Sequence, residues 1–127
     1  MKSKKSFPKN ILDAIRKDKI FGIRAGSDST HRIIGIWAVV VDDRVFVRSY
    51  SMKPRSWRRA FLEDPNGIIT VGEKEIRVCA IQTKSEKIKD AVSEAYKQKY
   101  KSPGDIQYVK DMSKKKSRDT TTELVIR

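Results

Sequence analysis

Hydrophobic residues gather most densely in the run Ile33–Val41, which is apolar almost throughout and rich in β-branched side chains. A run of this kind, without alternating polar positions, is typical of a strand that is covered on both faces. Asp42-Asp43 then supplies a tight turn, and residues 44–50 alternate between two faces. The pattern predicts a β-hairpin at the centre of the fold.

A second hairpin is predicted further along the chain. Ile68–Val71 and Lys74–Gln82 suit two strands that meet at Gly72-Glu73. Between the hairpins, residues 54–63 suit a short helical insert, and Asp64-Pro65-Asn66-Gly67 has the composition of a turn.

Helices are expected on both sides of the hairpins. A first helix should occupy residues 6–18, and a strand should follow at Ile20–Ala25. The clearest helical pattern begins at Thr83, which has capping-box spacing to Glu86, and it stops at Pro103-Gly104.

The last part of the chain completes the expected fold. Residues 105–118 are expected to form one helical turn and a basic loop, and Thr120–Ile126 alternates as a closing strand. Six strands with short turns favour an antiparallel barrel, because closure hides the sheet edges. The predicted class is mainly β, of α+β type, in one domain over residues 1–127 with a basic tail at 1–6 and a basic loop at 110–118.

The net charge of +13 is concentrated in three segments. Residues 1–10 carry four lysines and no acid, residues 53–60 carry four cations and no acid, and residues 110–118 carry five cations against Asp111. Such clusters attract phosphates, nucleic acid or other polyanions. The alternative is that the lysines only keep a small protein soluble.

Several functional classes are disfavoured. No apolar run has the length of a membrane span and residues 1–5 do not resemble a signal peptide, so we expect a cytoplasmic protein without a membrane partner. Cys79 is the only cysteine, which excludes an internal disulfide. His31 is the only histidine, and no cluster has metal-ligand spacing, so hydrolytic triads and metal sites are not indicated.

Arg48 is a candidate for a binding role, because it lies mid-strand on the face shared by Phe46 and Tyr50. A cation among aromatic side chains needs a partner. One candidate is a ligand phosphate, with further cations nearby in the sequence at Lys53, Arg55, Arg58 and Arg59. The other is a structural ion pair with Asp42, Asp43, Glu73 or Glu75. For Trp57, we expect an anchor of the insert against the barrel or, alternatively, a ring that stacks on a flavin.

A family resemblance is carried by five segments in consistent order: Ile36–Ser49, Trp57-Arg58-Arg59-Ala60, Gly67-Ile68-Ile69, Ala95–Tyr100 and Thr122-Glu123-Leu124. They resemble a family of small, uncharacterised bacterial proteins in the FMN-binding split-barrel superfamily. That superfamily includes pyridoxamine-phosphate-oxidase-like proteins and deazaflavin-dependent nitroreductases. The resemblance implies a six-stranded Greek-key split barrel, usually a homodimer, with a flavin, when present, in a groove at the subunit boundary.

The resemblance also implies which residues hold the cofactor. Arg48 and Ser49 match the strand end that approaches the phosphate, and Trp57 with Arg58 matches the start of the inserted helix. The loop 29–32 falls where nitroreductase relatives have a phosphate loop, with threonine in place of their glycine. The candidate cofactor-binding residues are Arg48, Ser49, Trp57, Arg58, Ser29, Thr30, Arg32 and Lys53.

Two functional hypotheses follow. The first is a barrel that binds FMN, a deazaflavin or another phosphorylated small molecule, and that is an oxidoreductase if it is an enzyme. The second is a barrel without a cofactor that binds nucleic acid or another polyanion. A homodimer is expected because one capping helix is too short to cover the outer face of Ile33–Val41.

Overall fold

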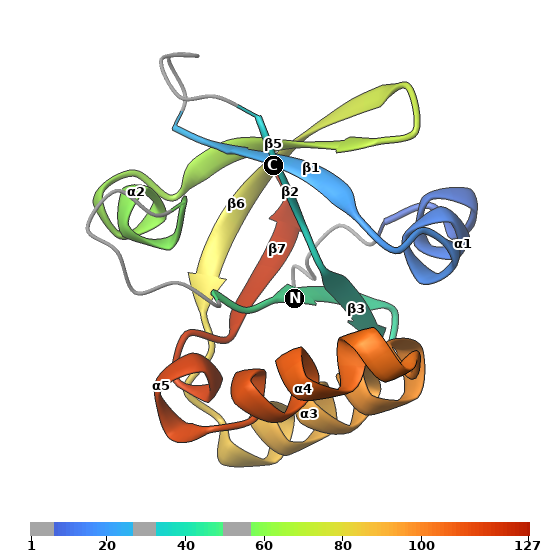
Figure 1. Ribbon diagram of the computed structural model, residues 1–127. Helices are drawn as coiled ribbons and strands as arrows, with labels where there is room; N and C mark the ends of the chain where they lie inside the picture. The colour runs from blue at the N-terminus through green and yellow to red at the C-terminus, as the bar shows by residue number, and fades with distance from the viewer. Residues whose placement is uncertain (1–6, 27–32, 50–56) are drawn as a thin grey trace.

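One antiparallel sheet of seven strands curls into a nearly closed barrel (Figure 1). The computed structural model describes residues 7–26, 33–49 and 57–127. The strands follow one another across the sheet in the order β2-β1-β5-β6-β7-β4-β3. Their bounds are β1 (Phe21–Ala25), β2 (Ile34–Ile36), β3 (Ala38–Val41), β4 (Arg44–Val47), β5 (Asn66–Val71), β6 (Lys74–Gln82) and β7 (Thr122–Ile126).

A single run of chain that bends at Trp37 supplies both ends of the sheet. The sequence predicts one strand over Ile33–Val41, whereas the structure has β2 before Trp37 and β3 after it. β2 pairs with β1 and β3 pairs with β4, so the two pieces lie at opposite ends of the strand order. The split barrel is therefore confirmed, with seven strands rather than six.

Both predicted hairpin turns occur where the local residue types favour them. Asp42 and Asp43 have φ angles of 51° and 60°, which are typical of a type I′ turn. Aspartate tolerates this left-handed region better than most residues do. Gly72, at a φ of 61°, lies in the turn between β5 and β6. The twist of such turns matches that of the flanking strands, so each hairpin closes with a defined register.

In the described part of the chain, five helices pack around the barrel (Figure 1). They are α1 (Lys9–Lys17), α2 (Trp57–Glu63), α3 (Glu86–Lys99), α4 (Pro103–Met112) and α5 (Lys115–Arg118). α3 and α4 lie side by side, and α3 packs on β3. None of these helices is both long and apolar enough to span a bilayer.

Two helical predictions need correction. Residues 110–118 are not a basic loop, because α4 continues to Met112 and α5 covers Lys115–Arg118. Val109 and Met112 lie among charged residues of the sequence, but both are buried on one side of α4. The cap of α3 is Ser85 rather than Thr83, and the Ser85 hydroxyl accepts a hydrogen bond from the Ile88 amide at 3.2 Å.

Two hydrophobic cores result from this arrangement. The first core lies within the barrel and includes Ile15 of α1, Phe61 of α2 and the strand residues Ile23, Ile69, Val78 and Leu124. The second core joins β3 and β4 to α3 and α4, through Val39, Phe46, Val92, Tyr96 and Met112. The second core exists because the strand residues alternate between the interior of the barrel and the helices.

The second core also changes the argument for a dimer. α3 and α4 already cover Val39 and Phe46, which are 1% and 0% exposed. A second copy of the chain is therefore not needed to cover β3, whereas Ile33 and Ile34 at the other end of this run are 48% and 38% exposed. The homodimer remains a prediction that depends on the family resemblance.

Candidate functional site

The predicted site residue Arg48 is buried just past the end of β4, with 2% of its surface exposed. Its Nε donates to the Thr121 hydroxyl at 2.8 Å. Its Nη1 donates to the Ser93 hydroxyl at 2.8 Å and to the Met112 carbonyl at 3.0 Å. Its Nη2 donates to the Lys89 carbonyl at 2.7 Å. All four acceptors are uncharged protein oxygens.

These contacts make Arg48 a tie between the barrel and the helices that cover it. Burial lowers the pKa of Arg48 to about 10, because the charged form loses its hydration. The alternative of a structural ion pair is not what the structure has, because the Arg48 guanidinium bonds neutral oxygens of α3, α4 and the chain before β7. The role predicted for Arg48 at a ligand phosphate stays a prediction. Protein oxygens also occupy most of its donors. The ligand site proposed below is therefore built without Arg48.

Ser49 belongs to the same buried connection. Its amide donates to the Thr120 hydroxyl at 2.8 Å, and its carbonyl accepts from the Ser117 hydroxyl at 2.8 Å. With 2% of its surface exposed, Ser49 joins the end of β4 to α5. The role predicted for Ser49 at a ligand phosphate stays a prediction.

Trp57 and Arg58 begin α2, and the two side chains differ in their surroundings. Trp57 packs partly buried against the barrel core, and its ring meets Phe61 edge to face at a centroid distance of 6.0 Å. This is the anchoring contact that the sequence indicates. The Nε atom of Arg58 is enclosed but has no hydrogen-bond partner within the described part of the chain. An unpartnered donor of this kind suits an anion.

Four of the predicted cofactor-binding residues, Ser29, Thr30, Arg32 and Lys53, lie outside the described residues. His31 lies outside them as well. Among the residues that the structure does describe, no three His, Cys, Asp or Glu side chains are grouped so that they could hold a metal ion.

The structure also brings together three arginines that sequence reasoning does not single out. In the pairing of β1, β5 and β6, Arg24 lies opposite Ile68, and Ile68 lies opposite Arg77. The Arg127 amide donates to the Arg77 carbonyl at 3.1 Å. This bond places Arg127, just past the end of β7, beside Arg77. The alternating burial of β1 directs Ile23 inward, so Arg24 points to the outside of the barrel.

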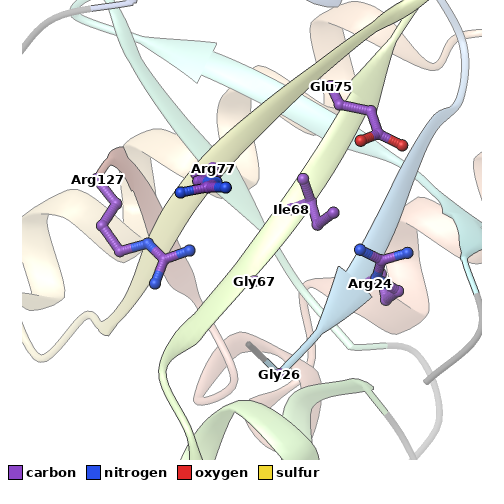
Figure 2. Close-up of a pocket in the computed structure, with 7 residues that line it drawn as sticks. All are labelled: Arg24, Gly26, Gly67, Ile68, Glu75, Arg77 and Arg127. Atoms are coloured by element: carbon purple, nitrogen blue, oxygen red, sulfur yellow. The ribbon is translucent and has the colours of Figure 1, made fainter. Parts of the chain in front are cut away.

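These arginines surround a hollow of about 410 Å³ on the outside of the barrel (Figure 2). Its lining residues are Arg24, Gly26, Gly67, Ile68, Glu75, Arg77 and Arg127. We call it the arginine hollow. The sequence signal for it is weak, because strand alternation predicts which side chains point outward but not which strands become neighbours.

Similar folds occur in solved structures. A conserved hypothetical protein from Mycobacterium tuberculosis matches with a TM-score of 0.62 and 12% identity, over 100% of this chain and 84% of the other. A Listeria innocua protein, provisionally named a pyridoxamine 5'-phosphate oxidase, matches at 0.61 and 12%, over 93% and 90%. An FAD-binding protein from Mesorhizobium loti matches at 0.55 and 10%, over 96% and 90%. These matches show the split-barrel fold.

The sequence itself matches a family without an assigned activity. No curated protein matches this chain in sequence. One family model matches residues 12–124, which is most of the chain and runs from α1 into β7. The chain therefore belongs to the family described as uncharacterised proteins conserved in bacteria, DUF2255.

Proposed function

We propose that this protein binds a phosphorylated ligand of the flavin class, with Arg58 as a donor to the phosphate. The observation that carries the proposal is the enclosed Nε of Arg58, which has no hydrogen-bond partner within the described residues. A buried donor without an acceptor costs about 1–3 kcal/mol. A ligand phosphate would remove this cost, because its oxygens accept readily from a guanidinium.

The neighbouring residues and the fold support a flavin. Trp57 fixes the start of α2 on the barrel and so limits the movement of the adjacent Arg58. FAD is bound by the similar Mesorhizobium loti protein, whose fold covers nearly the whole of this chain. A bound flavin would supply hydride or electron transfer, and the protein would supply binding and orientation. An oxidoreductase activity is therefore the chemistry that this proposal leads to.

A titration with FMN and riboflavin tests the proposal, because the two flavins differ in the phosphate. We expect wild-type protein to change FMN fluorescence on binding. Arg58→Met should weaken FMN binding about tenfold or more, as expected for the loss of one charge-assisted hydrogen bond, and should leave riboflavin binding unchanged. Arg59→Met is the matched control, because it removes the same charge from an exposed position of the same helix. Equal effects of both substitutions, or no FMN binding by wild type, would contradict the proposal.

Polyanion binding is the second candidate function. The exposed side chains of Arg77 and Arg127 and the three basic sequence segments favour it. Nucleic-acid binding of this kind should weaken steeply as the salt concentration rises. Three results together would favour this function over the first. The purified protein would be colourless, it would bind duplex DNA with a steep salt dependence, and it would not bind FMN.

A further inference from the structure

The arginine hollow concentrates positive charge on a regular part of the sheet. Arg127, just past the end of β7, lies beside Arg77 of β6, and Arg24 lies two strands away from Arg77 with Ile68 between them. Side chains directly opposite each other on neighbouring strands lie close enough to interact, and like charges there are destabilising. The fold therefore tolerates an unfavourable arrangement at this position.

The protein compensates this charge only weakly. Glu75 is the single acidic residue among the described lining residues, against three arginines. Within the described ranges, none of the three guanidinium groups has a carboxylate oxygen within 4.0 Å. Figure 2 shows Glu75 at one end of the hollow and Arg127 at the other. The cationic groups therefore keep donors that a ligand can use.

Arg24 provides a second and independent indication. Its Nε atom is enclosed, and in the described part of the chain it has no hydrogen-bond partner. Buried donors are nearly always paired in folded proteins, so an exception indicates a missing acceptor. Arg24 lines the same hollow as Arg77 and Arg127.

The size and walls of the hollow limit what can bind. Gly26 and Gly67 line part of the hollow with backbone alone. A volume of about 410 Å³ lies within the range of roughly 300–1,000 Å³ that is typical of small-molecule sites. The hollow is therefore large enough for a phosphate group with a small organic group attached. Ile68 would supply an apolar contact between the arginines.

We propose that the arginine hollow is a binding site for a phosphate group, either as inorganic phosphate or as the phosphate of a small monoester. Arg24, Arg77 and Arg127 donate to its oxygens, and Glu75 opposes it electrostatically at one end of the hollow. The site uses none of the residues of α2, and it does not depend on a bound flavin. Its donor set suits a compact dianion, because guanidinium groups from β1, β6 and the residue after β7 can address separate oxygens.

Calorimetric titration of the full chain at low salt tests this site, with inorganic phosphate and glycerol phosphate as probes. We expect Arg77→Met and Arg24→Met each to weaken phosphate binding about tenfold or more. Lys74→Met is the matched control, because it removes one positive charge from an exposed position of β6 that does not line the hollow. This control should change binding less than threefold, since it removes only long-range attraction.

A substitution that should strengthen phosphate binding keeps the test valid if an arginine variant folds poorly. Glu75→Gln should strengthen phosphate binding by about twofold to tenfold, because it removes the opposing carboxylate. Tighter binding of glycerol phosphate than of phosphate would identify a monoester as the ligand, and equal binding would identify free phosphate. Equal losses in Arg77→Met and Lys74→Met, or no effect of Glu75→Gln, would overturn the proposal. Loss of FMN binding in Arg58→Met with unchanged phosphate binding would show that the two sites are separate.

Discussion

Replacing Arg48 with methionine tests whether its guanidinium holds the helices on the barrel. Methionine keeps much of the apolar volume but cannot donate a hydrogen bond. The Lys89 and Met112 carbonyls then lose a donor that reaches them at 2.7 Å and 3.0 Å. The Thr121 hydroxyl is less affected, because it still donates to the Arg118 carbonyl at 2.6 Å.

The expected loss of stability follows from these contacts. Each buried acceptor that is left unsatisfied costs about 1–3 kcal/mol. Removal of a buried charge works in the opposite direction, and the lowered pKa of Arg48 reflects this burial. The Met112 carbonyl at the end of α4 is left without a donor, whereas the Lys89 carbonyl lies inside α3 and still accepts a backbone amide of that helix. We therefore expect Arg48→Met to lower the free energy of unfolding by about 1–3 kcal/mol. Arg48→Lys should recover little of this loss, because an ammonium group does not reproduce the planar fork of donors.

Urea denaturation followed by circular dichroism measures the effect. The unfolding midpoint should fall by on the order of 1–2 M, given the usual denaturant dependence for a protein of this size. Arg16→Met is the control, because Arg16 pairs with Asp13 and Asp43 at an exposed position and should matter by less than about 1 kcal/mol. Unchanged stability of Arg48→Met, together with lost phosphate or FMN binding, would refute the structural role and return Arg48 to a ligand site.

Two further predictions concern pH dependence and assembly. Lys99 donates to the Ile15 and Ala38 carbonyls at 2.6 Å, and burial lowers its pKa to about 8 from 10.5. Between these values the unfolded chain binds more protons at this residue, so its contribution to stability should rise with pH across this window. Urea denaturation at pH 7.5 and 9.5 should show this rise in wild type but not in Lys99→Met, and equal slopes would contradict it. Light scattering at micromolar concentration should report a homodimer, and the mass of one chain would exclude it.

Local sequence patterns were sufficient for most of the strands. The Asp42-Asp43 turn follows from residue types that tolerate positive φ, and it joins strands whose β-branched residues favour extended backbone. The hairpin at Gly72-Glu73 follows for the same reason. These features depend on neighbours in the sequence, so the sequence contains the information that specifies them.

Other features of the fold depend on contacts with residues that are far away in the sequence. The bend at Trp37 has no signature in an apolar run, because a straight covered strand and a bent one have the same composition. The charges of residues 105–118 favour a basic loop, but this stretch is largely helical because Val109 and Met112 pack in one core with residues of α3 and β4. Tertiary packing decided the structure of both segments.

The candidate sites show most clearly which features follow from the sequence and which follow from tertiary packing. The sequence identified Arg48 as a cation that needs a partner, but the four acceptors come from residues that are 41 to 73 positions away. The arginine hollow depends on Arg24, Arg77 and Arg127, which belong to three separate stretches of the chain. The sequence by itself determined which side chains carry charge and which positions of each strand share a face. Only the strand order and register decided which charges meet, because these depend on the packing of the whole barrel.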